Sequence, residues 1–307
     1  YMFSEYERGR TPNPDVLCNR EIKFDLFLKT AVSIGADYVA TGHYVRKSTS
    51  TIAGTEVHHL LSGLDSNKDQ SYFLCQLSQD QLAKALFPIG HLQKSVVREI
   101  AKTAGLVTAE KKDSQGLCFI GKVRLPDFLQ QKLEPKSGTV WEIPRDADVL
   151  SLPRTTRAEK AAPFNFHPKH GFKRGKHNGA HYYTTGQRKG LSIGGSPLPL
   201  FVLEVNTTYN AIFVGQGEDH PGLYREALFI KASELHWVRK DLALSIGESS
   251  TYDVRIRYRQ PLVKATVHRI EEGAYIVFDS PEKAITPGQF AAWYSGEELI
   301  GSGTISE

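Results

Sequence analysis

The sequence contains little of what disulfide-stapled or membrane-bound proteins need. Three cysteines occur in 307 residues, too few for a secreted scaffold held together by disulfide bonds. No apolar run approaches the roughly 18–20 residues of a membrane-spanning helix, which excludes an integral membrane protein. The first residues carry mixed charges and no apolar segment, so they form neither a signal nor a transit peptide. These absences predict a cytoplasmic protein, in which a reactive cysteine is catalytic or binds metal.

Several common active-site signatures are also missing. No two cysteines lie within four residues of one another, so there is no C-x-x-C pair for zinc. His58 and His59 are adjacent and would point to opposite faces of a strand. There is no G-x-S-x-G, no Walker A sequence and no G-x-G-x-x-G that opens a helix. We therefore expect no metal site.

The remaining composition is typical of a folded protein with several domains. Hydrophobic residues make up 40% of the chain and charged residues 23%. At roughly 100–200 residues per domain, the length predicts two or three domains. The formal net charge of +4 permits a nucleic-acid partner without requiring one.

The first third of the chain has an α/β pattern. Apolar residues near helical spacing predict an amphipathic helix over Glu21–Ile34. Tyr38–Thr41 follows as a short buried strand, closed by Gly42. This order is typical of a parallel sheet, which binds ligands at the carboxyl ends of its strands. Further helices are expected at Gln70–Leu86 with one interruption, at Ser95–Ala104 with Ser95 as its cap, and at Pro126–Leu133.

From Gly138 onward, short alternating runs are separated by Gly, Pro, Asn and Asp, a pattern typical of small β-barrels or sandwiches. Pro221-Gly222 and the polar residues after it mark a boundary between two β modules. The expected strands are Thr139–Ile143, Pro199–Val205, Ala211–Val214, Tyr252–Tyr258, Leu262–His268, Ala274–Phe278 and Phe290–Tyr294.

A basic stretch, Leu150–Gly190, lies in this β-rich part. From Arg154 to Gly190, nine residues are Lys or Arg, and Glu159 is acidic. Histidines and aromatic residues are interleaved, which would suit phosphate attraction and base stacking. A basic run alone is more often a solvated, partly disordered loop, and on that evidence we favour the loop.

Cys18 lies in a context that suits a reactive thiol. It follows the stiff segment Pro12-Asn13-Pro14 and directly precedes the Glu21–Ile34 helix, whose dipole would stabilise a thiolate. Asp15 is close enough in sequence to exchange a proton at a shared site. An inert cysteine buried under a turn is the alternative, and the residues alone leave both interpretations open.

The other two cysteines differ in context. Cys118 lies in Lys111–Gly121, where two lysines and flanking glycines suit a reactive thiol. A structural cysteine under a turn is slightly favoured there by spacing alone. Cys75 lies in an apolar helical context and is expected to be a small buried hydrophobe.

Seven blocks of sequence, in order from Gly9 to about Ile305, resemble the tRNA-specific 2-thiouridylase family (tRNA-uridine 2-sulfurtransferases). The blocks are Gly9–Asn19 (GRTPNPDVLCN), Ala40–Tyr44 (ATGHY), Leu64–Phe73 (LDSNKDQSYF), Lys111–Gly121 (KKDSQGLCFIG), Thr185–Gly195 (TGQRKGLSIGG), Arg255–Gln260 (RIRYRQ) and Thr286–Gln289 (TPGQ). This resemblance favours the reactive interpretation of Cys18 and Cys118.

The resemblance implies a fold that is α/β followed by β. Residues 1–123 would be the remainder of an adenine-nucleotide alpha-hydrolase-like domain (PP-loop, Rossmann-like). Residues 124–221 would form a central β-rich tRNA-binding domain with the basic insertion. Residues 222–307 would form a C-terminal β-barrel.

The resemblance also implies a reaction, the 2-thiolation of the wobble uridine of tRNA (EC 2.8.1.-). ATP, with Mg²⁺, adenylates the uridine oxygen, and a donor protein delivers persulfide sulfur to Cys118. Cys18 assists sulfur release, ending in a disulfide with Cys118 or in free hydrogen sulfide. Asp15 is the acid/base residue. The implied partners are tRNA and the sulfur-relay donor protein, with no membrane.

Binding residues are implied by the same blocks. Gly42 matches a nucleotide-binding position at a strand end. Asn13, Pro14 and Asp15 match the segment that contacts the target base. The positions implied to contact tRNA elsewhere are Lys68, Asp69, Gln70, Tyr258 and Arg259.

One departure from the family concerns its S-G-G-x-D-S pyrophosphate loop, which is absent. It would lie upstream of Tyr1, so we expect upstream sequence to be missing and this chain alone not to catalyse adenylation. The competing interpretation is a non-catalytic tRNA-binding protein that has lost the ATP loop. A ligase similar to argininosuccinate synthetase is a third, but it would not explain two reactive-looking cysteines or the β-rich second half.

Overall fold

A computed structural model describes residues 1–111 and 125–306. Its first helix, α1 (Met2–Glu7), is followed by one continuous helix made of three labelled parts: α2 (Pro14–Leu17), the π-helical η1 (Cys18–Leu26) and α3 (Phe27–Ser33). The helix predicted from Glu21 therefore exists but begins at Pro14. Asn13 caps it, its side chain accepting a hydrogen bond from Val16 N, and Pro14 occupies the first turn, where its fixed φ is favourable.

The strand predicted at Tyr38–Thr41 is β1 (Val39–Ala40), and it pairs in parallel with β4 (Ala85–Leu86). The parallel arrangement is as expected. The expected helix over Gln70–Leu86 is only partly correct, because β4 forms its end. Between the two strands lie β2 (Val45–Ile52), β3 (Thr55–Ser62), the 3₁₀ turn η2 (Ser71–Leu74) and α4 (Gln79–Ala83).

Two further helices flank the part of the chain that the structure leaves out. In α5 (Lys94–Thr103), Gln93 rather than Ser95 occupies the N-cap position, without a side-chain capping hydrogen bond, and none of the helix residues is buried. Gly105 follows it with φ +67°, as expected for a glycine that ends a helix. α6 (Leu125–Leu129) is the remnant of the helix expected at Pro126–Leu133. None of the helices in the described residues is long and apolar enough to cross a membrane.

The central region forms a four-stranded sheet in the order β6-β5-β8-β7. β5 and β8 run parallel, whereas the other neighbours are antiparallel. Its buried side chains face two clusters, one around Phe213 and one around Val202. The strands are β5 (Gly138–Glu142), β6 (Phe172–His177), β7 (Leu200–Asn206) and β8 (Ala211–Gln216), and the short helices are η3 (Asp148–Leu150), α7 (Arg157–Ala161), η4 (Pro168–His170) and η5 (Ala180–Tyr182).

The basic stretch Leu150–Gly190 is folded, so its interpretation as a partly disordered loop is wrong. It contains α7, capped by Thr156, and β6, which pairs with β5. Phe166 and His177 within it are buried. Apolar residues spaced among the basic ones anchor the segment to the central sheet, and its net charge gave no sign of this.

The C-terminal region belongs to a nine-stranded sheet with the path β2-β3-β15-β14-β11-β12-β13-β9, and β10 pairs with β15. The sheet curls so that Ser306 N, just after β15, donates to Phe229 O in β9. The strands are β9 (Tyr224–Lys231), β10 (Leu235–Trp237), β11 (Ser249–Arg255), β12 (Val263–Ile270), β13 (Gly273–Lys283), β14 (Phe290–Ser295) and β15 (Glu298–Thr304); η6 (Pro221–Leu223), η7 (Ala232–Glu234) and η8 (Lys240–Leu242) connect them.

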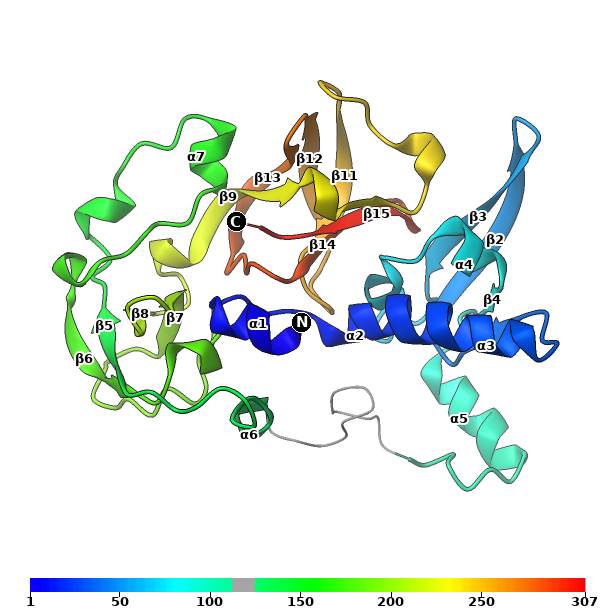
Figure 1. Cartoon of the computed structure of the whole chain (residues 1–307), viewed down its shortest axis with the longest axis horizontal. Coiled ribbons are helices and arrows are strands. Elements are labelled where there is room, and N and C mark those ends of the chain that lie inside the picture. The colour runs from blue at the N-terminus through cyan, green and yellow to red at the C-terminus, as the bar shows by residue number, and fades with distance from the viewer. Residues whose placement is uncertain (112–124, 307) are drawn as a thin grey trace.

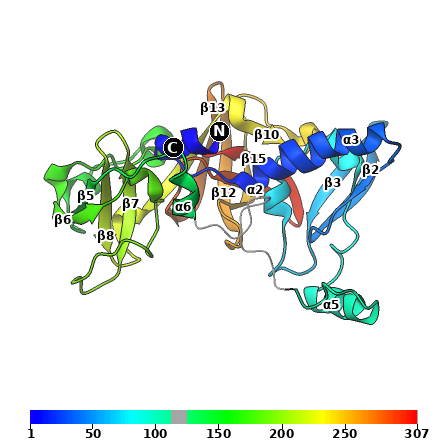
Figure 2. The ribbon, with the colours of Figure 1, turned by 60° about the horizontal axis from the view of Figure 1, so that its bottom comes forward.

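The β2–β3 hairpin joins the first part of the chain to this C-terminal sheet. Leu61 in β3 pairs with Glu298 in β15. A single core cluster contains Val16 and Phe24 from the long helix together with Phe290 and Tyr294 from β14. Figures 1 and 2 show the hairpin and the central sheet on opposite sides of the C-terminal sheet, with the long helix running past it. Residues far apart in sequence thus share one core.

Candidate functional site

The segment Thr11–Asn13 is held in place by the loop Thr286–Gln289 of the C-terminal region. Thr11 N donates to Pro287 O at 2.9 Å. The Gln289 side chain donates from Nε2 to Thr11 O at 2.8 Å and to Pro12 O at 3.4 Å. Its Oε1 accepts from Asn13 Nδ2 at 3.3 Å. We call these contacts the Gln289 clamp, and they fix the residues just before the helix of Asp15 and Cys18.

One glycine, Gly288, and one threonine, Thr184, also hold the Thr11–Asn13 segment in place. Gly288 has φ +92°, and a Cβ there would lie 2.9 Å from Thr11 O. Only glycine therefore allows the loop to approach so closely. From the central region, Thr184 Oγ1 lies 3.0 Å from Thr11 Oγ1. The blocks GRTPNPDVLCN and TPGQ, which are separated in sequence by more than half the chain, are direct neighbours here.

Asp15 and Cys18 lie on the first turns of the long helix. Asp15 is in the first turn, where a carboxylate is favoured by the helix dipole. Cys18 is buried, with 9% of its surface exposed, and it begins the π-helical part. The expectation that Cys18 directly precedes the helix is wrong, because Asn13 and Pro14 start the helix earlier. The dipole acts mainly on the first turn, so it favours Asp15 more than Cys18.

Asp15 and Asn19 lie four residues apart, and therefore on one face of the helix. Within the described residues, Oδ1 of each is buried and accepts no hydrogen bond. Asn19 Nδ2 donates to Phe73 O at 3.0 Å, which fixes the orientation of the amide. An unpaired buried acceptor typically costs about 1–3 kcal/mol and needs an explanation such as a ligand or a catalytic role.

Phe73 also connects this helix to Tyr258 and Arg259. The rings of Phe73 and Tyr258 are 4.3 Å apart. The Arg259 guanidinium lies 5.1 Å from the Tyr258 ring centre, and Arg259 has φ +64°. Arg259 is exposed. The structure therefore brings the positions implied to bind tRNA, Tyr258 and Arg259, close to the helix that carries Cys18.

In the segment Lys68-Asp69-Gln70, two side chains bond to the protein and the third is half-exposed. The Asp69 side chain is buried, accepts from Gly63 N and Ser71 N, and forms a 3.1 Å ion pair with Arg255. Gln70 Oε1 accepts from Tyr44 N at 3.0 Å. Asp69 and Gln70 thus hold the loop to the protein, and Lys68 is half-exposed.

The segment Gly42-His43 follows β1 at the carboxyl end of the strand. Gly42 is exposed, and a Cβ there would meet only Ile89, at 4.0 Å. His43 is buried behind it, and its Nδ1 lies 2.8 Å from Thr41 Oγ1. Burial lowers the pKa of His43 to about 4, so it is neutral at physiological pH. Gly42 is thus exposed at the carboxyl end of β1, the position where the sequence predicts a nucleotide contact.

The other two cysteines are Cys75, which the structure describes, and Cys118, which it does not. Cys75 is fully buried, and burial raises the pKa of its thiol to about 12. It is the inert hydrophobe that the sequence predicted. Cys118 lies outside the described residues, as does nearly all of its block Lys111–Gly121.

Among the described residues, no group of three or more His, Cys, Asp or Glu side chains is arranged to hold a metal ion. His58 and His59 do lie on opposite faces of β3. His58 Nδ1 is 2.9 Å from Thr49 Oγ1, and His59 Nδ1 is 2.7 Å from Glu298 Oε1.

The sequence reasoning missed the role of Gln289. The TPGQ block carried a sequence signal, but nothing near it in the chain indicates that its glutamine bonds to Thr11–Asn13. Thr184 and Asn19 were also not singled out.

Three protein-family models match parts of the chain. They are described as the tRNA methyl transferase HUP domain, at residues 1–122, the tRNA methyl transferase PRC-barrel domain, at 164–216, and the aminomethyltransferase beta-barrel domain, at 228–305. The expected fold class, a nucleotide-binding α/β part followed by two β-rich parts, is confirmed.

Curated relatives match across the whole chain. The tRNA-specific 2-thiouridylase MnmA of Christiangramia forsetii is 59% identical over 313 residues, covering 100% of this chain and 79% of the relative. That of Flavobacterium johnsoniae is 59% identical over 314 residues, with the same coverage. That of Bacillus subtilis is 46% identical over 308 residues, covering 100% of this chain and 74% of the relative.

Proposed function

The chain belongs to the tRNA-specific 2-thiouridylase family, and from this membership we propose how its residues replace O2 of the wobble uridine in tRNA with sulfur. The single observation that carries the function is the 59% identity to a 2-thiouridylase over the entire chain. That stretch includes Asp15, Cys18 and the Thr286–Gln289 loop that clamps their segment.

The first step uses ATP, because a pyrimidine carbonyl oxygen is a poor leaving group. Attack of the uridine O2 on the α-phosphorus releases pyrophosphate and leaves O2 bonded to AMP. Gly42 contributes to the nucleotide site, since it is exposed at the carboxyl end of β1 and leaves space for a ligand. Mg²⁺ accompanies ATP as its counterion.

The second step delivers sulfur from a persulfide on Cys118, supplied by a donor protein. The terminal sulfur attacks C2, AMP leaves, and the base is linked to Cys118 through a disulfide bond. The Cys18 thiolate then attacks the Cys118 sulfur, which breaks that bond, forms a Cys18–Cys118 disulfide and leaves the thiocarbonyl on the base. The two thiols are oxidised and the transferred sulfur is reduced, so the electrons balance. Alternatively, the Cys18 thiolate first attacks the inner sulfur of the Cys118 persulfide, which forms the Cys18–Cys118 disulfide and frees hydrogen sulfide; the sulfide then attacks C2 and displaces AMP.

Asp15 exchanges the proton at the base during these steps. It lies one helical turn before Cys18, and its Oδ1 accepts no hydrogen bond within the described residues. Asn13 and Pro14 place it, because they cap and start the helix that carries it. The wobble base lies in an anticodon loop, where it is single-stranded and costs little to flip into a pocket.

tRNA contacts come from side chains around this helix. Lys68, Tyr258 and Arg259 are exposed or half-exposed, whereas Asp69 and Gln70 hold the loop that carries Lys68. The site of action is the cytoplasm. A non-catalytic tRNA-binding protein is not favoured, because such a protein has no need of Asp15 and Cys18 together.

The test is mass spectrometry of tRNA nucleosides from cells that lack the gene. 2-Thiouridine derivatives at the wobble position should disappear, and the intact gene should restore them. A gene encoding Cys18→Ser should restore them poorly. Unchanged 2-thiouridine in the deletion strain would refute the function.

A further inference from the structure

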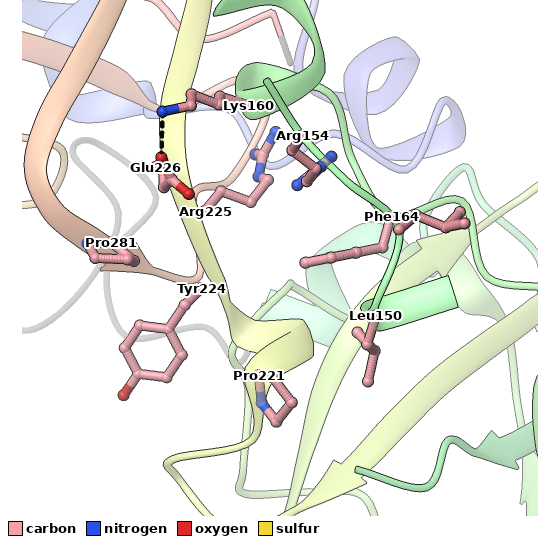
Figure 3. Close-up of a pocket in the computed structure, with 10 residues that line it drawn as sticks. Leu150, Arg154, Lys160, Phe164, Pro221, Tyr224, Arg225, Glu226 and Pro281 are labelled. Atoms are coloured by element: carbon pink, nitrogen blue, oxygen red, sulfur yellow. Dashed lines mark ion pairs between the residues drawn. The ribbon is translucent and has the colours of Figure 1, made fainter. Parts of the chain in front are cut away.

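A cavity of about 600 Å³ lies where the basic stretch meets the first strand of the C-terminal region. Its lining includes Leu150, Arg154, Phe164, Tyr224 and Arg225. Figure 3 shows the side chains of Arg154 and Arg225 together at one end, with Pro221 and Tyr224 toward the other. The volume is in the range that holds small ligands and nucleotides.

The charge in this cavity favours an anion. Three cationic side chains, Arg154, Lys160 and Arg225, and one carboxylate, Glu226, line it, which leaves a net charge of +2. The carboxylate is already neutralised, because Lys160 Nζ lies 2.6 Å from Glu226 Oε2. Arg225 is buried and donates to the backbone oxygens of Ala161 and Ile285.

Arg154 is the cation best placed to bind a ligand. It donates from Nη2 to the backbone oxygens of Ala162 and Pro163, which carry no net charge. Among the described residues it forms no ion pair, and no hydrogen bond occupies its Nε or Nη1. Burial lowers the pKa of Arg154, while the carboxylates of Glu226 and Glu159 raise it. An arginine stays charged at neutral pH, so Arg154 keeps two donor groups for an anion, as phosphate recognition by arginine requires.

Stacked rings hold Arg154 in position. Its guanidinium lies 4.4 Å from the ring centre of Phe164. Phe164 stacks on Phe166 at 5.7 Å, and Phe166 contacts Phe213 at 6.0 Å. Because Phe213 is fully buried, these planar groups run from the core of the central region to the cavity. A fixed guanidinium loses less conformational entropy when a ligand binds.

A second cavity lies between this one and the Gln289 clamp. Phe164 and Arg225 also line this second cavity of about 600 Å³, whose walls include Gly9, Arg10 and Pro287. Pro287 belongs to the loop that holds Thr11, and Gly9 and Arg10 directly precede Thr11, so the second cavity adjoins the Gln289 clamp. An RNA bound with its target base at Asp15 is therefore a candidate to reach the cavities beside the clamp.

We propose that the cavity of Arg154 and Phe164 binds one nucleotide of the substrate tRNA, with its phosphate on Arg154 and its base or ribose against the apolar end. This site rests on the proposed function and adds to it a nucleotide contact outside the target-base site. The ligand that this cavity would recognise is a phosphate joined to a flat, partly apolar group.

The test compares Arg154→Gln with Arg157→Gln, using a fluorescent anticodon stem-loop RNA and the protein expressed from its own complete gene. Arg157 is an exposed residue of α7 in the same basic stretch and does not line the cavity. Arg154→Gln should weaken binding about tenfold and lower the log–log salt slope by about 0.7, the amount for one phosphate on a single strand. Arg157→Gln should change affinity less than about twofold, because Arg157 does not line the cavity and so would not contact the nucleotide bound there.

Two further measurements complete the test. Uridine monophosphate alone should compete at least about tenfold more weakly than the stem-loop; equal competition would show that a free nucleotide is the ligand and would overturn the proposal. If Arg154→Gln fails to fold, photo-crosslinking of wild-type protein to a 5-bromouridine stem-loop replaces it. A crosslinked peptide with Phe164 or Tyr224 supports the site, and crosslinks only elsewhere overturn it.

The outcomes separate this site from the proposed function. Wild-type protein that binds no stem-loop RNA would contradict both. If the wild-type protein binds and thiolates the RNA, but Arg154→Gln and Arg157→Gln change both properties equally, only the nucleotide site is contradicted.

Discussion

Replacing Gln289 by leucine should slow the reaction without touching any reacting atom. The variant keeps the volume of the side chain but loses the donors to Thr11 O and Pro12 O and the acceptor for Asn13, at 2.8, 3.4 and 3.3 Å. A net hydrogen bond is typically worth about 0.5–1.5 kcal/mol, and two of these three are long, so the loss is about 2 kcal/mol. These hydrogen bonds hold the Thr11–Asn13 segment, which directly precedes the helix that carries Asp15 and Cys18.

A loss of this size in positioning lowers the rate by about tenfold or more, since about 1.4 kcal/mol is a factor of ten. The assay is single-turnover thiolation of tRNA, with kcat and tRNA affinity measured separately. We expect kcat to fall and the affinity for tRNA to change by less than about threefold, because tRNA binding uses many contacts outside the clamp.

The matched control is Gln79→Leu. The Gln79 side chain also makes three hydrogen bonds, in its case all to the backbone: with His58 N, His58 O and Val238 O at 2.8, 2.9 and 2.8 Å. It does not contact the clamped segment, so its loss should lower stability by a similar amount and leave kcat unchanged. Equal effects of the two variants on kcat, or no effect of Gln289→Leu, would refute the positioning role.

Three other outcomes are expected. Cys18→Ser should greatly reduce thiolation while Cys75→Ser leaves it near normal, and native Cys75 should resist iodoacetamide below pH 9 because its pKa is raised to about 12; equal loss in both variants, with folding intact, would contradict the relay. The pKa of His43 is lowered from 6.5 to about 4 by burial, so the unfolded state gains a proton first as pH falls; in urea unfolding His43 should contribute at most about 3 kcal/mol to the loss of stability from about pH 6.5 to 4, and His43→Gln should decline less steeply than wild type, with the remainder due to other histidines of lowered pKa such as His177 and His236; equal slopes would contradict this. Lys173→Ala and Lys176→Ala, both exposed in β6, should each lower the salt slope of tRNA binding by about 0.7, and an unchanged slope would remove them from the interface.

Sequence patterns predicted the elements whose signals are local. The strand at Val39–Ala40, the helix ending at Gly105 and seven β-strands all follow from apolar spacing and turn residues. The β2–β3 hairpin was missed because its strand Val45–Ile52 is largely polar and its turn is Ala53-Gly54, at φ +49° and +81°, rather than an Asn-Gly pair.

The site itself was only partly predictable. The residues Asp15 and Cys18 stand in one local block, and their types indicate the chemistry. The Gln289 clamp joins residues 276 to 278 positions apart, and no local propensity encodes such a contact. The helix start was misplaced for a related reason: Pro12 and Pro14 suggest a turn, yet Pro14 suits the first turn of a helix once Asn13 caps it.

The long reach of the clamp has a consequence for biosynthesis. Domains generally fold in order as the ribosome makes them, starting from the N-terminus. Thr11 cannot bond to Pro287 and Gln289, nor β3 to Glu298 in β15, until nearly the whole chain has been translated. The nascent protein therefore carries Cys18 before the Thr11–Asn13 segment is fixed, and chains that terminate before the Thr286–Gln289 loop cannot form the clamp. The clamp is completed only when the last strands of the barrel have been made.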